Sequence, residues 1–175
     1  MGRTREPDRV KGICGIISRP EIDSDIIRKN LREILGDIDS GSGDFDFSYT
    51  NYYESEMGRD LRRMFFSFRD LIEPDAIAEI KLKTNAIEDA YAIDGKRRIN
   101  LDPGFIHSAK LVLATTKNFA HRVYIRSGIY GDVQLRHMHG KWVAHDWTYP
   151  DYRTAEALAW FTQVRQNYQK QVKHA

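Results

Sequence analysis

The order of strand-like and helix-like patterns over the first 104 residues constrains the fold of this chain most strongly. Residues 10–17 form a short apolar run rich in β-branched side chains, which indicates a buried strand. Residues 22–35 place isoleucine and leucine at helical spacing, and Gly36 follows where a helix would end. Residues 45–49 alternate aromatic and polar side chains, which is the period of a half-buried strand.

The next four patterns complete this order. Residues 61–71 indicate a third strand, and a second helix opens at Pro74 with an apolar stripe at spacings of three and four. Residues 98–101 indicate a short strand that the turn tripeptide of residues 102–104, Asp-Pro-Gly, stops. Strand, helix, strand, strand, helix, strand predicts an α+β fold with a ferredoxin-like (split βαβ) antiparallel sheet, its first and third strands adjacent in the middle and both helices on one face.

The remaining 71 residues are expected to form a C-terminal β-meander and a terminal helix. Residues 109–116 fit a helix or a strand. The meander comprises residues 122–125, 129–138 and 142–145, with turns at Ser127-Gly128 and Gly140-Lys141, and the helix begins after the N-cap Thr154. We therefore expect a flexible tail over residues 1–9 and one domain over residues 10–175, divided into a core (10–104) and the meander with its helix (105–175).

Length and composition are those of one ordinary globular domain. The chain has 175 residues, of which 41% are hydrophobic and 30% charged, and no run approaches the ~18 apolar residues of a membrane span. Cys14 is the single cysteine, so no intrachain disulfide can form, and its apolar strand favours a core position. We expect a cytoplasmic protein without a membrane partner.

Charge is unevenly distributed along a chain whose net charge is only +2. Residues 1–90 carry 14 Lys/Arg against 19 Asp/Glu, a net charge of −5, and residues 91–175 carry 13 against 6, a net charge of +7. The small net charge argues against a protein devoted wholly to nucleic acid. The basic half either favours an anionic partner or forms a solvated face balanced by its acidic neighbour.

Several nucleotide and metal motifs are absent from the sequence. Neither Gly95-Lys96 nor Gly140-Lys141 continues into a phosphate-binding P-loop, and no G-x-G-x-x-G or G-x-S-x-G occurs, so a P-loop GTPase is excluded. His137 and His139 share a strand face, but a turn at Gly140-Lys141 would pair His139 with Trp142 and point His145 to the opposite face. No metal site is predicted.

Polar chemistry is most crowded between residues 96 and 122. Lysine and arginine could neutralise a phosphate or carboxylate, Asp102 could orient them, and His121 titrates near neutrality, as proton transfer requires. The alternative is a solvated strand end with a turn. Two other blocks are unusual: residues 52–58 are either a packed loop or a site wall, and residues 147–153 either cover a ligand or anchor the last helix.

Five groups of residues together resemble a known family over nearly the whole chain, in the right order. They are residues 46–50 with 52–58, 79–81 with 84–85, 95–104, 114–122 and 147–153. The chain resembles the bacterial domain-of-unknown-function family 4416. The resemblance implies no activity, but it implies the positions to consider as a site: Tyr53, Glu56, Lys81, Asn85, Asn100, Asp102, Lys117, His121, Arg122, Asp151 and Arg153.

Three functional hypotheses follow from these residues. The first is binding, with possible turnover, of an anionic phosphate-bearing metabolite or nucleotide, for which the ligand-binding candidates are Tyr53, Lys81, Asn85, Asn100, Lys117, Arg122, Asp151 and Arg153. His121, Asp102 and Glu56 are the catalytic candidates. The second is RNA binding through the sheet face, with Phe45, Phe47 and Tyr49 as a stacking platform and Arg62, Arg63 and Arg98 nearby. The third is a protein-interaction module without a small ligand. The sequence specifies no cofactor and no oligomeric state.

Overall fold

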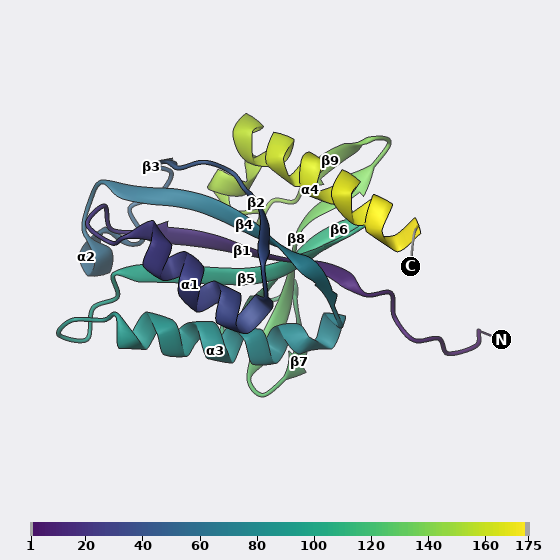
Figure 1. Cartoon of the computed structure of the whole chain (residues 1–175), viewed down its shortest axis with the longest axis horizontal. Helices are drawn as coiled ribbons and strands as arrows, with labels where there is room; N and C mark the ends of the chain where they lie inside the picture. Colours follow the sequence, from purple (N-terminus) through teal and green to yellow (C-terminus); the bar gives the residue numbers. More distant parts are fainter. Residues whose placement is uncertain (1, 174–175) are drawn as a thin grey trace.

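A computed structural model describes residues 2–173 as a mixed α/β protein with one large, open antiparallel sheet (Figure 1). Its strands are β1 (Val10–Ser18), β2 (Ile38–Gly41), β3 (Phe45–Phe47), β4 (Leu61–Ile72), β5 (Ile99–His107), β6 (Lys110–Thr115), β7 (Arg122–Arg126), β8 (Ile129–Met138) and β9 (Lys141–Ala144). Its helices are α1 (Ser24–Leu35), α2 (Glu54–Met57), α3 (Ile77–Ala90) and α4 (Ala155–Lys173), with 3₁₀ turns η1 (Pro74–Ala76) and η2 (Pro150–Arg153). None of these helices is both long and apolar enough to cross a membrane.

The central strand of the sheet is β1, which is buried along its whole length. The strand order is β2-β4-β1-β5-β6-β8-β7, with β3 paired to β4 and β9 paired to β8. Every pairing is antiparallel. The apolar run predicted as a buried strand is therefore the strand on which both halves of the sheet are assembled.

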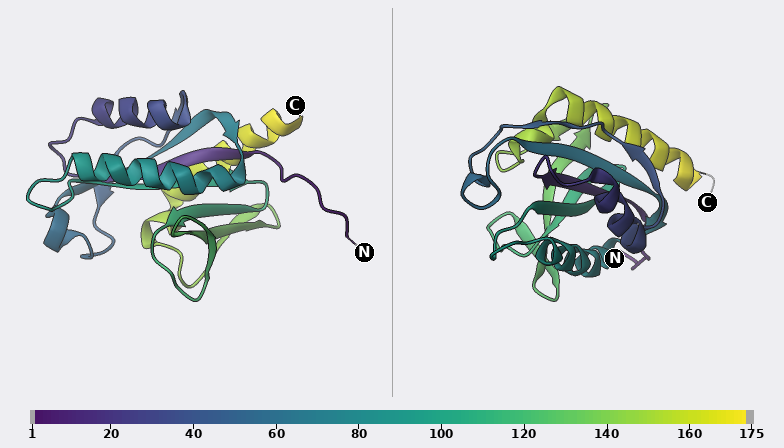
Figure 2. Two further views of the ribbon diagram at one scale, coloured as in Figure 1. Left: turned by 90° about the horizontal axis from the view of Figure 1, so that it is seen from below. Right: turned by 60° about the vertical axis from the view of Figure 1, so that its left-hand side comes forward.

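Helices cover both faces of this sheet (Figure 2). Because successive side chains of a strand point to opposite faces, Cys14 and Ile16 pack toward α1 and α3, whereas Ile13 packs toward α4. The first face buries Leu31 of α1 and Ile77 of α3, both fully enclosed. The sheet is thus the middle layer of three.

Several elements predicted from the sequence are confirmed. Residues 10–17 and 61–71 are strands, and residues 22–35 contain α1, which ends at Gly36 with φ = 81°, a conformation that favours glycine. Thr154 caps α4, because its hydroxyl accepts a hydrogen bond from the Ala157 backbone N–H at 3.2 Å. The ambiguous segment at 109–116 is the strand β6.

The turn predicted at residues 102–104 is wrong, because β5 runs through it as a continuous strand. The β5–β6 ladder spans Gly104 to His107, so Pro103 lies before it and removes no hydrogen bond from that ladder. A Cβ at Gly104 would lie 2.3 Å from the Val112 carbonyl oxygen. Glycine is needed at this position because the two strands approach each other closely. The Asp-Pro-Gly sequence therefore belongs to a strand here and does not form a turn.

The predicted turn at Gly140-Lys141 is also wrong by one residue. The turn residues are His139 and Gly140, with φ of 48° and 80°, and Met138 pairs with Lys141. A tight hairpin requires positive φ at both central residues, which glycine adopts freely and histidine tolerates better than most residues. His137 therefore pairs with Trp142, where the sequence predicted His139.

Candidate functional site

Two adjoining cavities open where the ends of β5 and β6 meet α3, η2 and the loops that follow β3 and β6. Their volumes are about 260 Å³ and 310 Å³. Both are lined by the same five residues: Tyr52, Tyr53, Asp102, Lys117 and Tyr149. The first and last of these residues are 97 positions apart in the sequence. The fold therefore assembles the shared wall from four separate segments of the chain.

The first cavity has a polar wall. Apart from the shared residues it is lined by Lys81, Asn85, Glu88, Asp89, Arg97, Asn100, Ala114, Thr115 and Thr116. This set contains cationic donors, anionic acceptors, and neutral amide and hydroxyl groups that can do both. The wall is suited to a polar, hydrogen-bonding ligand.

The second cavity has a largely aromatic and aliphatic wall. Apart from the shared residues it is lined by Ile17, Phe47, Thr50, Arg122, Pro150 and Asp151. The Phe47 ring lies edge-on to the Tyr53 ring with centroids 5.9 Å apart, and Tyr52 meets Tyr53 in the same way at 5.0 Å. Three rings therefore support one another along this wall.

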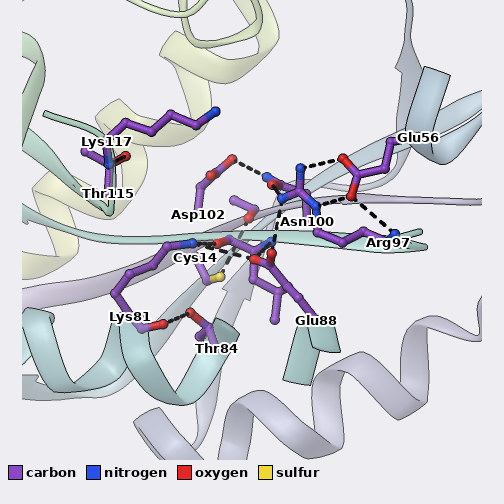
Figure 3. Close-up of polar contacts among 12 residues, drawn as sticks. Cys14, Glu56, Lys81, Thr84, Glu88, Arg97, Asn100, Asp102, Thr115 and Lys117 are labelled. Atoms are coloured by element: carbon purple, nitrogen blue, oxygen red, sulfur yellow. Dashed lines mark hydrogen bonds and ion pairs between the residues drawn. The ribbon is translucent and has the colours of Figure 1, made fainter. Parts of the chain in front are cut away.

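A network of charged side chains holds the wall of the first cavity (Figure 3). Arg97 donates two hydrogen bonds to the Glu56 carboxylate, at 2.7 and 2.8 Å, and also contacts Glu88 at 3.2 Å and the Asn100 carbonyl at 2.8 Å. Asn100 then donates to Asp102 at 3.0 Å. The hydrogen bonds from Arg97 lower the pKa of Glu56 and hold it ionised.

Lys81 and Glu88 extend the network into the buried side of α3 (Figure 3). The Lys81 ammonium donates to the Leu101 carbonyl at 2.7 Å and lies 3.5 Å from Glu88, which accepts the Leu101 backbone N–H at 2.8 Å. Burial raises the pKa of Glu88, and the charge of Lys81 opposes that rise. Both peptide groups of one β5 residue are thus fixed by α3 at the cavity edge.

Arg63 of β4 is a fully buried cation behind the shared wall. Its guanidinium lies 2.8 Å from Asp151 and 3.5 Å from Asp102, and over the Phe65 ring at 4.4 Å. Burial raises the pKa of Asp151, whereas the charge of Arg63 lowers it. Two carboxylates from distant segments are therefore held at one place by a single buried cation.

Lys117 differs from the other cations of the site. Its ammonium donates a hydrogen bond to the Tyr52 hydroxyl, and within residues 2–173 it forms no ion pair with a carboxylate. Tyr53 is nearby, and burial raises the pKa of its hydroxyl, which therefore stays protonated and able to donate. The two cavities therefore share a neutral donor and an exposed lysine ammonium that has no carboxylate partner in the described residues.

Most of the residues expected to form a site are brought together. Eight of them line one or both cavities: Tyr53, Lys81, Asn85, Asn100, Asp102, Lys117, Arg122 and Asp151. Glu56 lies behind Arg97, which it positions. Arg122 lines the second cavity while its Nε donates to Asp132 at 2.8 Å.

His121 and Arg153 are not part of either cavity wall. The His121 ring stacks on Trp147 with centroids 4.6 Å apart, and its Nε2 lies 3.4 Å from Asp132. Arg153 donates to backbone carbonyls of residues 145, 146 and 148, at 2.7 to 2.9 Å. Arg153 therefore anchors the segment before α4, while two other residues of the same block, Tyr149 and Asp151, line the second cavity.

Several residues that line or hold the cavities are not among those predicted from the sequence, including Arg63, Glu88, Arg97 and Tyr149. Glu88 lies seven residues after Lys81, on the same helical face, so helical spacing could have found it. Arg63 shares a strand face with Leu61 and Phe65, and a charge inside that alternation was the signal. Arg97 and Tyr149 stood in blocks already noted as unusual.

The rings expected to form an RNA-binding platform are mostly packed. Phe47 is 8% exposed, Phe45 is half-buried against Phe65, and Tyr49 is 39% exposed beyond the end of β3. Residues of α4, β8 and β9 cover the neighbouring part of that face. In the described range 2–173, no group of three His, Cys, Asp or Glu side chains is arranged to hold a metal ion.

The fold and the site together define a three-layer α/β domain whose sheet ends in a pair of adjoining polar and aromatic cavities. The chain belongs to the family described as domain of unknown function DUF4416, whose model matches residues 8–168. This agrees with the resemblance seen in the sequence blocks. No curated protein and no solved structure matches the chain.

Proposed function

We propose that this protein binds a small anionic metabolite or nucleotide that carries a phosphate group, in the two adjoining cavities. The observation that carries the proposal is Lys117, a cation that lines both cavities and has no carboxylate partner in the described residues. Its exposed ammonium is available to an anion that enters either cavity. Lysine is a common phosphate ligand in proteins.

The other cations support this choice because their charges are already balanced. Lys81 and Arg97 pair with Glu88 and Glu56, and Arg63 pairs with Asp151. Arg122 pairs with Asp132. Of the cations that line the cavities, Lys117 is thus the one without a carboxylate partner in the described residues, and the first cavity also presents the carboxylate of Asp89; a single phosphate suits this balance better than a polyanion.

Neutral groups around Lys117 would complete the recognition of such a ligand. Asn85, Thr115 and Thr116 line the first cavity, and Tyr53 offers its hydroxyl. The Oδ2 atom of Asp102 accepts a hydrogen bond from the Asn100 side chain and lies near the Arg63 guanidinium. The other carboxylate oxygen, Oδ1, is left to accept a hydrogen bond from a ligand hydroxyl. A carboxylate with fixed orientation is a strong acceptor for such a group.

The proposal is one of binding rather than of a defined reaction. His121, predicted to transfer protons, faces Trp147 and Asp132 instead of the cavities. Asp102 and Glu56 are held by Asn100 and Arg97. Their arrangement supports positioning of a ligand.

A charge-matched pair of variants tests the proposal. Lys117→Gln removes the uncompensated cation, and Lys141→Gln removes an exposed lysine from the start of β9, outside both cavities. Sugar phosphates and nucleoside monophosphates are screened by thermal shift and then titrated by calorimetry. A ligand present at 100 times its Kd stabilises the wild type by roughly 2.7 kcal/mol. We expect Lys117→Gln to weaken binding at least about tenfold, since a charge-assisted hydrogen bond contributes roughly 1.5–3 kcal/mol, and Lys141→Gln to leave it unchanged.

The absence of a shift with every phosphate in the screen would remove the proposal. Equal loss of affinity in both variants would also contradict it, because the effect would then come from net charge alone.

A protein-interaction role is the second candidate. Phe119, Val123 and Tyr124, at and before the edge strand β7, are 65%, 72% and 57% exposed. Exposed large apolar side chains on an edge strand favour contact with another chain. Light scattering of the wild type and of Val123→Lys at matched concentrations tests this role. The same molecular mass for the two proteins would exclude self-association through this edge.

The first half of the sheet supports a finer description of the fold. We propose that β2, β4, β1 and β5, with α1 and α3, form a ferredoxin-like unit. Support comes from the strand order β2-β4-β1-β5, from its antiparallel pairing and from the placement of both helices on one face. An experimental structure superposed on ferredoxin-like domains would test this description.

A further inference from the structure

We infer that the ligand of the proposed site has three parts: a planar ring in the second cavity, hydroxyl groups at the shared wall and a phosphate in the first cavity. This is the chemistry of a nucleoside monophosphate. The inference rests on the proposed function and goes beyond it by naming the class of ligand. It is carried by the contrast between the two cavity walls and by the residues that they share.

The second cavity is suited to an uncharged ring. Its wall joins Phe47 and Tyr53 to Ile17 and Pro150, so rings and aliphatic groups line one space of about 310 Å³. The Phe47 and Tyr53 rings meet edge-on at an interplanar angle of 67°. Aromatic and apolar walls hold a planar heterocycle by stacking and burial, with little dependence on its hydrogen-bonding edge.

The first cavity is unsuited to such a ring. Lys81, Glu88 and Arg97 line it, and each is engaged in an ion pair with a partner in the same wall. Burying an apolar ring against these groups would remove water from them and supply no replacement hydrogen bonds. A compact phosphate can instead accept hydrogen bonds from Lys117, Asn85 and the Thr115 and Thr116 hydroxyls of this wall, at a distance from the carboxylate of Asp89 that its small size permits.

The shared wall provides for the link between the two parts. Asp102 has one carboxylate oxygen fixed by Asn100, and Lys117 and Tyr53 face both cavities. A sugar at this wall would donate its hydroxyls to Asp102, and its phosphate would lie within reach of Lys117. The ring, the sugar and the phosphate would therefore lie in the second cavity, at the shared wall and in the first cavity, in that order.

Three probes and two variants separate this inference from the proposed function. The probes are adenosine 5′-monophosphate, ribose 5-phosphate and adenosine, titrated by calorimetry against the full chain. Thr50→Trp places a large side chain in the second cavity from an exposed residue, and so blocks the ring without removing core packing. Lys117→Gln removes the cation, and thermal unfolding of each variant verifies that it is folded.

We expect adenosine 5′-monophosphate to bind at least tenfold more tightly than either ribose 5-phosphate or adenosine. Thr50→Trp should abolish this advantage over ribose 5-phosphate and leave the affinity for ribose 5-phosphate within about twofold of the wild type.

Equal affinity for the nucleotide and ribose 5-phosphate, with both lost in Lys117→Gln, would overturn the three-part ligand while the proposed function stands. A nucleotide affinity that Thr50→Trp leaves unchanged would also overturn it. If neither phosphate binds, or if Lys117→Gln has no effect on either, the proposed function and this inference both fail.

Discussion

Helices α3 and α4 cover opposite faces of the same sheet, yet they bury different chemistry. The buried side of α4 is apolar or aromatic throughout: Ala157, Trp160, Phe161, Val164 and Tyr168. The buried side of α3 begins in the same way with Ile77 and Ile80 and then changes to Lys81, Thr84 and Glu88. Both helices are amphipathic, but only α3 carries charges into the interior.

This difference separates residues that stabilise the fold from residues that form the site. A buried charge lowers the free energy of unfolding unless ion-pair or hydrogen-bond partners satisfy it, so its presence in the interior calls for a reason other than stability. The partners of Lys81 and Glu88 are the backbone of Leu101 and the Arg97 side chain, which lie at the first cavity. A buried carboxyl with a raised pKa beside a cavity, as Glu88 is, is a candidate for a functional role.

The largest effect on stability should come from α4. Phe161→Ala removes a fully buried ring that packs on Phe65 and Tyr152, and we expect the free energy of unfolding to fall by about 3–5 kcal/mol. Urea unfolding measures this loss. Ligand affinity, titrated where the variant is folded, should remain within about twofold of the wild type, and a large loss of affinity would break the distinction between the two helices.

A smaller loss of stability should accompany a charge change in α3. Glu88→Gln leaves the Lys81 ammonium buried without its counter-charge, and we expect the free energy of unfolding to fall by roughly 1–3 kcal/mol. Ligand affinity should fall as well, because Glu88 lines the first cavity.

Glu79→Gln is the matched control, since it makes the same change on the exposed side of α3. It should leave both the unfolding midpoint and the ligand affinity unchanged. Equal behaviour of the two glutamine variants would show that the buried charges of α3 have no special role.

The ion pair between Arg97 and Glu56 should make the stability of the protein depend on pH in the acid range. The pKa of Glu56 is lowered from its ordinary value of 4.5, so its contribution to stability is complete above that pH and is lost as the pH falls through the lowered value. We expect Glu56→Gln to destabilise the protein at pH 7 by up to about 1 kcal/mol, because the pair is partly exposed to solvent. Unfolding measured at decreasing pH from 7 should show this difference begin to shrink once the pH falls below 4.5, the ordinary pKa of a glutamate, and vanish only below the lowered pKa of Glu56. A difference that does not shrink at all below pH 4.5 would mean that the charge of Glu56 is not its source.

The smallest effect should come from the hydroxyl of Tyr52. Tyr52→Phe keeps the ring and removes the group that Lys117 contacts, so we expect an unfolding free energy within about 0.5 kcal/mol of the wild type. Binding of a phosphate ligand should be unchanged or up to a few times tighter, since the ligand no longer competes with the hydroxyl. A tenfold loss in calorimetry would instead place Tyr52 among the residues that bind the ligand.

The sequence predicted the elements of the first half better than the details of their ends. Apolar periodicity identified β1, α1, β4 and α3 because burial imposes it directly. The short strand β2 was missed, since Ile38 is its single large apolar residue. Asp102-Pro103-Gly104 was read as a turn because local propensity cannot reveal that β6 approaches Gly104 too closely for a side chain.

The site could be predicted in its composition but not in its geometry. Blocks rich in charge and tyrosine pointed to Asp102 and Lys117, which do meet at the shared wall. His121 was included because its chemistry suits proton transfer, and a sequence cannot show that its ring stacks on Trp147. Arg63 was missed as a site residue because its partners, Asp102 and Asp151, come from segments that only the folded sheet brings together.

Amide chemical shifts recorded during titration with adenosine 5′-monophosphate test the central claim most directly, because they locate a ligand without any substitution. We expect the largest changes at residues that line the two cavities, among them Tyr53, Asn85, Thr115 and Lys117, with little change along α4. Changes confined to α4 or the β8–β9 hairpin, or no changes at millimolar nucleotide, would contradict it.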